Sequence, residues 1–459
     1  MRLLKAQNFI FGLWLGLLGC ANLDDNVSTN GNVQLFFSTD TVLFDTLITG
    51  RNSITRRFRA FNQSKENIEI SSISVGTGDQ SSYSLIVNGK EGKSIENEVL
   101  NGEDSILVLI SAFIDEQDES MPFLVKDSVV FRWNGNQADV KLVAYGQDAN
   151  FLGNEIICDE TWSMGKPYVI TEPILIDSLC TLTLEAGTKV YIDNGAVIDV
   201  KGQLLVRGDT GTLNVVFRNT RFDDAFVEAP GQWGGIRFFP GSSGNEIQFA
   251  TIENAVNGIF TFGTNSEEAR VEISIENTTI RHMSGSGVQA FTSNISMTNS
   301  LIYNCSSFLF SGFVGGSYSI DHCTFSNQPN FFVRDEPSFV AVDNFSGDPS
   351  LVENLDLTLT NSIIWGSEQE EFFIRNEGGA SLDTNIFQNI IKSVEEIPGN
   401  LTSTDFNFPG FNDPFAFDYS LDTLSNAKDA ATGSVLEIDI NGIMRDDLPD
   451  IGAFERIEN

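Results

Sequence analysis

The chain has 459 residues, with 63 acidic and 27 basic side chains and a formal net charge of −36. Its length indicates two or three domains. Binding to nucleic acid or to anionic lipid head groups needs clustered Lys and Arg. Because the basic residues are spread along the chain without a cluster, the composition excludes both as partners.

The first residues have the pattern of an export signal. Arg2 and Lys5 precede an apolar run over 9–18, which is shorter than the roughly 20 residues that a membrane-spanning helix needs. A short positive start followed by such a run predicts a signal peptide over 1–19.

Gly19 and Cys20 end this run and resemble the lipobox of bacterial lipoproteins. The resemblance implies that Cys20 is acylated after cleavage and attaches the protein to a membrane. The acidic stretch over 20–31 is expected to be a tether. It resembles the export tag of Bacteroidetes lipoproteins, which implies an outer-membrane location facing the cell exterior; a spacer without an address is the alternative.

From 32 to 147 the chain alternates short apolar strands with polar turns. Period-two alternation, as in 58–61 and 140–143, is typical of strands with one buried face. Several such strands within about 100 residues predict a two-sheet β-sandwich. The order of elements resembles immunoglobulin-like modules of the Hydin type, which implies a spacer.

From 155 to 459 apolar triplets are separated by Gly, Asn and Asp. A repeat of this length is typical of stacked structural units. We predict a right-handed parallel β-helix with three strands per coil, and therefore an all-β protein. Three triplets recur with offsets of 24, 22 and 25 residues: those starting at Ile174, Leu182 and Val190 align with those starting at Ile198, Leu204 and Val215.

The later coils align on one apolar column formed by Ile252, Ile280, Ile302, Phe325 and Ile364. Asparagine recurs three positions before and two positions after this column, and both histidines of the chain fall in these two places. Stacked amides can bond from coil to coil and satisfy buried backbone groups. We therefore predict a structural ladder made of Asn254, Asn277, His282, Asn299, Asn304, His322, Asn327 and Asn361.

The remaining cysteines and the histidines offer little chemistry. A zinc site of the usual spacing is not expected, because the chain has no CxxC and only two histidines. Serine- or cysteine-type hydrolysis would need one of the ladder histidines. Cys305 and Cys323 fall in different columns and are expected to stay unpaired. Cys158 and Cys180 are one coil apart, and a disulfide and two buried thiols both stay open.

The best place for carbohydrate chemistry is the insertion over 218–232, which carries Asp223 and Asp224. Asp199 and Arg237 occupy outward positions and are expected to be neighbours across it. Glycoside hydrolysis needs two carboxylates facing one groove, and an acidic loop beside an outward Asp and Arg could bind Ca²⁺ or a uronic acid. A solvated loop with a surface ion pair explains the same residues.

Four motifs resemble the right-handed β-helix lipoproteins of Bacteroidetes, in which an immunoglobulin-like module precedes a pectate-lyase-like β-helix. The resemblance covers most of the mature chain and implies this architecture. It implies no activity, because a fold does not fix a function. The motifs are KPYVI at 166–170, LTLEAGTKVY at 182–191, PGQWGGI at 230–236, and PDIGAFE at 449–455 after Asn441, Gly442 and Arg445.

These patterns predict a lipid-anchored surface protein of the outer membrane, non-catalytic, whose β-helix binds a polysaccharide or an outer-membrane protein. Two alternatives stay open: a polysaccharide lyase or hydrolase acting from the β-helix, and an accessory subunit of an outer-membrane complex. No metal site or cofactor is expected, apart from the Ca²⁺ that the acidic insertion could bind.

Overall fold

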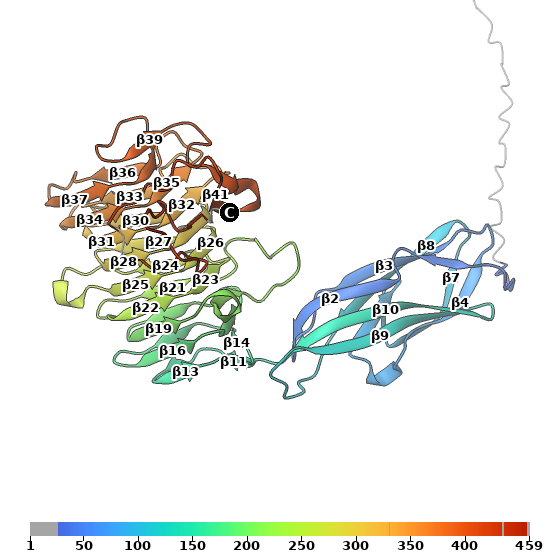
Figure 1. Cartoon of the computed structure of the whole chain (residues 1–459). Coiled ribbons are helices and arrows are strands. Elements are labelled where there is room, and N and C mark those ends of the chain that lie inside the picture. Colours follow the sequence, from blue (N-terminus) through green and yellow to red (C-terminus); the bar gives the residue numbers. More distant parts are fainter. Residues whose placement is uncertain (1–25, 330, 434–435, 457–459) are drawn as a thin grey trace, which may run out of the picture. The chain divides into compact units, whose positions relative to one another are not determined.

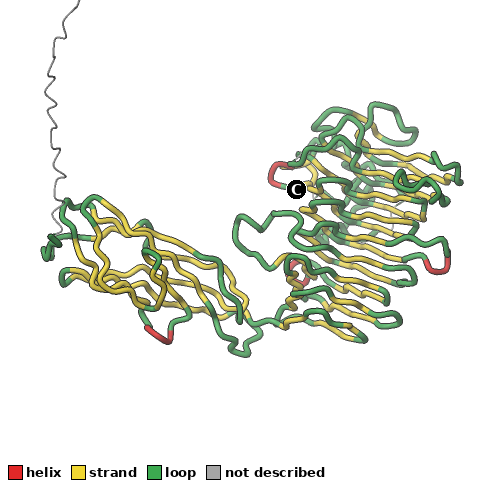
Figure 2. The backbone as a smooth tube through the Cα atoms, turned by 180° about the vertical axis from the view of Figure 1, so that it is seen from behind, coloured by secondary structure: helices red, strands yellow, loops and turns green. Residues whose placement is uncertain are grey.

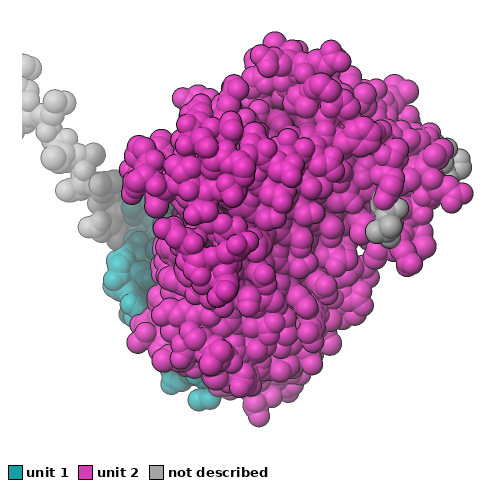
Figure 3. Space-filling view, turned by 90° about the vertical axis from the view of Figure 1, so that its left-hand side faces the viewer, with its two compact units in different colours: residues 1–115, 124–145 teal, residues 116–123, 146–459 magenta. Residues whose placement is uncertain are grey.

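The computed structural model describes residues 26–329, 331–433 and 436–456. The predicted signal peptide over 1–19 and the predicted lipidation site Cys20 lie outside the described residues. The chain forms two compact units, coloured separately in Figure 3. The first contains residues up to Asp115 together with Leu124–Tyr145, and the second contains Glu116–Phe123 and everything from Gly146 onward.

The first unit is a β-sandwich of two five-stranded sheets. Its strands alternate between buried and exposed residues, as Phe58 and Ala60 do on either side of the exposed Arg59. Trp133 is buried and donates its indole N–H to the carbonyl of Val33 at 2.8 Å. One sheet has the order β1 (Leu35–Phe37), β3 (Arg56–Asn62), β8 (Asp104–Ala112), β5 (Tyr83–Val87), β6 (Lys90–Gly92). The other has the order β2 (Thr41–Ile48), β10 (Asn136–Gln147), β9 (Phe123–Trp133), β4 (Ile68–Val75), β7 (Ser94–Leu100).

The second unit is built on three parallel sheets, which we call the β11, β12 and β13 sheets after their first strands. Up to β38, successive strands go to successive sheets, so the chain winds in coils that stack in one direction (Figures 1 and 2). The predicted fold class, a sandwich followed by a parallel β-helix, is confirmed.

The β11 sheet contains β11 (Asn150–Leu152), β14 (Tyr168–Ile170), β17 (Lys189–Ile192), β20 (Val215–Asn219), β23 (Ala250–Glu253), β26 (Thr279–Met283), β29 (Leu301–Cys305), β32 (Thr324–Asn327), β35 (Ile363–Gly366), β38 (Ile390–Lys392) and β39 (Leu401–Ser403). The β12 sheet contains β12 (Ile156–Ile157), β15 (Ile174–Ile176), β18 (Ile198–Val200), β21 (Ile236–Phe238), β24 (Ile259–Thr261), β27 (Val288–Phe291), β30 (Phe310–Phe313), β33 (Phe339–Val342) and β36 (Phe372–Arg375). The β13 sheet contains β13 (Glu160–Trp162), β16 (Thr181–Glu185), β19 (Gln203–Arg207), β22 (Asn245–Gln248), β25 (Glu272–Glu276), β28 (Asn294–Thr298), β31 (Gly316–Asp321), β34 (Leu355–Thr360) and β37 (Leu382–Phe387).

The register of the later coils is the one that the apolar column predicts. Ile252 pairs with Ile280, which pairs with Ile302. The prediction is wrong for one earlier triplet, because Val190 pairs with Phe217 and not with Val215. A turn that contains the 3-10 helix η2 (Gly211–Leu213) precedes β20 and lengthens this coil.

A disulfide between Cys158 and Cys180 joins the first two coils, with their Cα atoms 4.6 Å apart. This decides the alternative that the sequence leaves open. Cys305 and Cys323 are free, as predicted, and the structure shows that both are buried. Burial raises the pKa of both thiols to about 12, which keeps them as unreactive thiols.

The helices of the described chain are single 3-10 turns, and none has the length and apolarity needed to cross a bilayer. Besides η2 they are η1 (Gly78–Gln80), η3 (Glu267–Ala269) and η4 (Pro414–Ala416). A short antiparallel pair, β40 (Phe411–Asp413) and β41 (Asp418–Leu421), lies in the C-terminal segment.

Candidate functional site

The outward face of the β11 sheet is covered by the C-terminal segment of the chain itself. Outward side chains of the late coils, including Tyr303 and Trp365, are buried in a second apolar cluster with C-terminal residues such as Tyr419. The Trp365 indole N–H donates to the carbonyl of Phe406 at 3.0 Å, and the backbone N–H of Gly452 donates to the carbonyl of Asn361 at 2.8 Å. This face is therefore not free for a partner.

The insertion over 218–232 packs onto early coils of the same sheet. The Asn254 side-chain amide donates to the carbonyls of Val227 and Ala229, both at 3.0 Å, and Phe222 packs edge-on against Tyr191 with ring centroids 4.9 Å apart. The insertion thus acts as a lid over outward side chains of the β-helix.

Asp223 and Asp224 in this insertion do not join Asp199 and Arg237. Both oxygens of Asp223 accept from the guanidinium of Arg221, at 2.9 and 3.2 Å, and Asp224 is exposed. Asp199 and Arg237 are brought together, as the sequence predicts, but they bind each other: Arg237 Nε and Nη2 donate to the two carboxylate oxygens at 2.6 and 2.8 Å. The pair bridges neighbouring strands β18 and β21. Each candidate carboxylate except Asp224 is therefore already bound by an arginine.

The predicted ladder residues lie at the two bends on either side of the β11 sheet. Seven of the eight have backbone φ angles between 46° and 66°, and Asn327 is the exception. Asn tolerates this left-handed conformation better than most residues. The recurrence of asparagine in these columns is therefore explained by the left-handed backbone at the bends. Hydrogen bonding between amides alone does not explain it.

Side-chain bonds from one coil to the next occur at two ladder steps. The amide of Asn299 donates to Asn277 Oδ1 at 2.8 Å, and Asn304 Nδ2 lies 2.6 Å from His282 Nδ1. Asn327 instead binds the backbone of Cys305 through both its amide atoms.

Other ladder residues fasten the covering segments. Asn299 accepts from Arg445 at 2.7 Å, and Asn361 exchanges hydrogen bonds with the backbone of Thr432. Both histidines are buried, and burial lowers the pKa of His282 to about 3 and lowers that of His322. These two rings are neutral structural groups at physiological pH.

The outward face of the β12 sheet carries a column of half-buried phenyl rings. Phe239 stacks on Phe262 with ring centroids 4.5 Å apart, and Phe291 lies against Phe313 at 5.5 Å. Phe260 contacts both Phe262 and Phe291 and links the two pairs. One of these pairs is stacked, two are tilted and one is edge-on, so the column stabilises successive coils through ring contacts.

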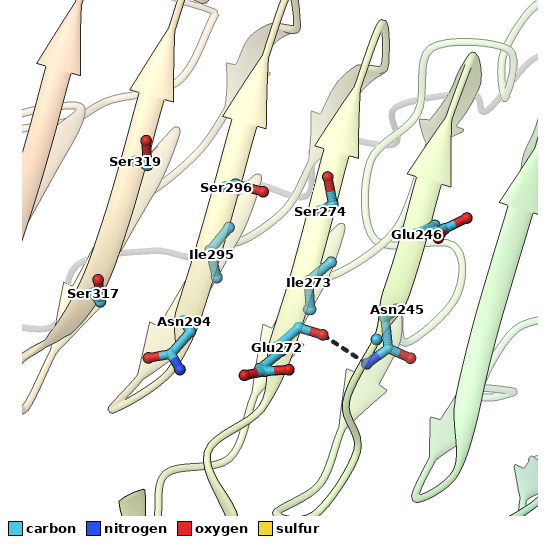
Figure 4. Close-up of a pocket in the computed structure, with 11 residues that line it drawn as sticks. Asn245, Glu246, Glu272, Ile273, Ser274, Asn294, Ile295, Ser296, Ser317 and Ser319 are labelled. Atoms are coloured by element: carbon cyan, nitrogen blue, oxygen red, sulfur yellow. Dashed lines mark hydrogen bonds between the residues drawn. The ribbon is translucent and has the colours of Figure 1, made fainter. Parts of the chain in front are cut away.

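The outward face of the β13 sheet has short polar side chains in register. One column runs from Glu246 through Ser274 and Ser296 to Ser319, one residue on each of four neighbouring strands. A second column beside it contains Glu272, Asn294 and Ser317. These side chains form a row across β22, β25, β28 and β31 (Figure 4).

A shallow hollow of about 400 Å³ lies over these two columns. Its lining contains the carboxylates of Glu246 and Glu272 and no basic residue. The buried Asn245 donates to the backbone carbonyl of Glu272 at 2.9 Å and accepts from the backbone N–H of Leu204 at 2.8 Å, which fixes the edge of the hollow. We call this feature the serine hollow.

The sequence patterns that predict the coils and the ladder do not by themselves point to the serine hollow. The signal is present in the segments EISIE at 272–276, NISMT at 294–298 and SYSID at 317–321, where apolar residues alternate with polar ones. Once the apolar columns are aligned, the polar residues between them align as well. Within the described part of the chain, no three His, Cys, Asp or Glu side chains lie together so as to bind a metal ion.

Neither the known protein families nor the curated proteins contain a match to this sequence. Among solved structures, the chain is similar to a protein of unknown function from Porphyromonas gingivalis, with 11% identity over 28% of this chain and 60% of that chain and a TM-score of 0.19. It is also similar to a PapD-like domain of human CEP192, with 9% identity over 29% of this chain and 99% of that domain and a TM-score of 0.19. A family 123 glycoside hydrolase from Clostridium perfringens shares 8% identity over 27% of this chain and 26% of its own, with a TM-score of 0.18. Overlaps of this size do not bear on the serine hollow.

Proposed function

We propose that the chain is a non-catalytic binding protein of the bacterial cell surface. In this proposal Cys20 carries a lipid anchor in the outer membrane, the protein faces the cell exterior, and the β-helix binds a glycan or another protein. The observation that carries the proposal is the outward face of the β13 sheet. Its short polar side chains are in register on successive coils, and no described segment covers the exposed Ser296 and Ser319, unlike the outward residues of the β11 sheet.

The state of the candidate catalytic residues supports binding over catalysis. A general acid or nucleophile must be free to exchange a proton or to attack. Asp199 is bound in a two-point ion pair with Arg237, and Asp223 is bound by Arg221. The closing motif around Arg445 and the lipobox at Cys20 support membership in the Bacteroidetes β-helix lipoproteins that the sequence resembles.

The binding proposal is tested with the full chain on immobilised soluble and insoluble polysaccharides and by co-purification from native membranes. We expect retention on a glycan or recovery of a partner, without release of reducing or unsaturated sugar ends. Release of such ends, lost in Asp223→Asn or Asp199→Asn, would replace binding by lyase or hydrolase activity.

The anchor is tested separately by incorporation of labelled palmitate. The wild-type chain is expected to incorporate the label and to sediment with outer membranes. Cys20→Ser is expected to do neither. An unlabelled wild-type chain would refute the anchor and leave the binding proposal standing.

A further inference from the structure

Several polar groups of the serine hollow are not used within the described part of the protein, although Asn245 and Glu246 are. Among the described residues, the hydroxyls of Ser274, Ser296 and Ser319 and the amide of Asn294 have no hydrogen-bond partner in the protein. Polar side chains elsewhere in this sheet are hydrogen-bonded within the protein; for example, the Thr360 hydroxyl donates to the Asp321 carboxylate at 2.8 Å. The hollow therefore offers donors and acceptors that a ligand can use.

The charge of the hollow selects among ligands. Glu246 and Glu272 lie in the lining without any Lys or Arg in it, and the whole chain carries a net charge of −36. Arg207 lies outside the lining and pairs with Glu246 at 3.6 Å. An anionic sugar polymer would have to compete with Glu246 for this cation and would be repelled by Glu272. A ligand with many hydroxyl groups and no charge fits this lining, because it can donate to the carboxylates and exchange hydrogen bonds with the serines.

The repeat of the hollow selects for a polymer. Neighbouring parallel strands are about 4.8 Å apart, and outward residues along one strand are about 6.6 Å apart. Ser274, Ser296 and Ser319 therefore present the same hydroxyl at each step along the axis of the β-helix. A chain of repeating units that lies along this axis meets the same group at every coil, whereas a compact ligand would use only one or two of them.

We propose that the serine hollow binds one strand of a neutral polysaccharide, lying along the axis of the β-helix across β22, β25, β28 and β31. This rests on the proposed binding function and names its ligand class and its site. The serine hydroxyls and the Asn294 amide bond to sugar hydroxyls, and Glu272 accepts from them. The aromatic column is not part of the site, because it lies on the β12 sheet and its rings already contact one another.

The first test compares two full-length variants by titration with a soluble neutral β-glucan, a neutral mannan and polygalacturonate. Ser296→Trp fills the centre of the hollow and is expected to weaken binding of the neutral polymer at least about tenfold. Gln289→Trp is the matched control, because it places the same bulk on the outward face of the β12 sheet, in the strand that precedes β28. It is expected to bind like the wild type.

A milder variant guards against misfolding of the first. Asn294→Ala removes one amide without adding volume and is expected to weaken binding about threefold to tenfold, as the loss of one hydrogen bond does. Thermal unfolding of each variant is measured beside binding. If Ser296→Trp does not fold, Asn294→Ala decides.

Each outcome has a defined meaning. Wild-type affinity for a neutral polymer in both Ser296→Trp and Asn294→Ala would overturn the serine hollow as the site and leave the binding function intact. Binding of polygalacturonate alone would overturn the neutral ligand. Retention on no polysaccharide, together with recovery of a protein partner from membranes, would overturn this inference and support the protein-binding form of the proposed function.

Discussion

Two faces of the same β-helix differ in whether other segments of the chain cover them. The β11 sheet is covered by the C-terminal segment and by the insertion over 218–232, whereas the β13 sheet is left open. Both sheets alternate inward and outward residues on the same coils. They differ in what points outward: the β11 sheet presents Tyr303 and Trp365, and the β13 sheet presents Ser296 and Ser319.

This difference follows from the cost of exposing large apolar side chains. Tyr303 and Trp365 would each leave a large apolar surface in water if the C-terminal segment were absent. Serine leaves almost none. The outward side chains of a sheet therefore determine whether covering that sheet stabilises the protein. A sheet with small polar outward side chains can stay exposed and is accessible to a ligand.

The largest expected effect is at the fastening of the cover. Arg445 is buried and donates to Glu455 at 3.1 Å and to Asn299 at 2.7 Å. Arg445→Ala leaves the buried Glu455 without its cation and is expected to cost about 3–5 kcal/mol. Denaturant unfolding measures this loss, and limited proteolysis should cut the C-terminal segment first.

The matched control for this change is Arg207→Ala. Arg207 lies on the open sheet with Glu246 at 3.6 Å, and both side chains are largely exposed. We expect a loss below about 1 kcal/mol. A loss in Arg445→Ala as small as that in Arg207→Ala would mean that this fastening of the cover adds no more stability than a surface ion pair.

The next effect concerns the start of the β-helix. Cys158 and Cys180 are 22 residues apart in the sequence and join the first coil to the second. The double variant Cys158→Ser, Cys180→Ser is expected to lose about 3 kcal/mol through added freedom of the unfolded chain. Hydrogen exchange should rise most in β12 and β13. A uniform rise over all coils would contradict a local role for the bridge.

A smaller, pH-dependent effect is expected beside the covered sheet. His282 is buried, and its pKa falls from 6.5 to about 3 on folding. Below pH 6.5 the unfolded chain takes up a proton that the folded chain does not, so stability falls as the pH drops toward 3. His282→Asn keeps the residue type of the ladder and removes this term.

Thermal or urea unfolding of His282→Asn and the wild type should be compared at pH 7 and pH 5. The variant is expected to gain about 1–2 kcal/mol relative to the wild type on going to pH 5. An unchanged difference between the two pH values would show that His282 is protonated in the folded protein.

The smallest effect is expected on the open face. Ser296→Ala removes a hydroxyl that has no hydrogen-bond partner among the described residues, so it should change the free energy of unfolding by less than about 0.5 kcal/mol. The same variant measures whether this hydroxyl contributes to binding of a neutral polysaccharide. A large loss of stability would mean that the serine column supports the coils and is not free for a ligand.

The sequence predicts the coils well because their inward residues repeat. The column of Ile252, Ile280 and Ile302 gives the observed register. The prediction fails at Val215, where a turn lengthens a coil and the triplet pattern carries no sign of it. Periodic burial is thus readable from the sequence, and local insertions are not.

The surroundings of the site are predicted less well, because contacts made by loops and covering segments do not repeat from coil to coil. The predicted strand register places Asp199 beside Arg237, as observed. The sequence does not reveal that Arg221 binds Asp223 within one loop. The position of the C-terminal covering segment also cannot be predicted from the sequence, because its contacts, such as the one between Arg445 and Asn299, join residues 146 positions apart. The serine hollow needed only the alignment that the apolar columns already provide.

The long separation between Arg445 and Asn299 also sets an order of assembly. During synthesis the coils can form as soon as their own residues are present, since each coil contacts mainly its neighbours. Tyr303 and Trp365 remain uncovered until the last segment of the chain arrives. We therefore expect a folding intermediate in which the outward apolar residues of the β11 sheet are exposed to solvent. A chaperone that binds this exposed face should have its largest effect at this stage.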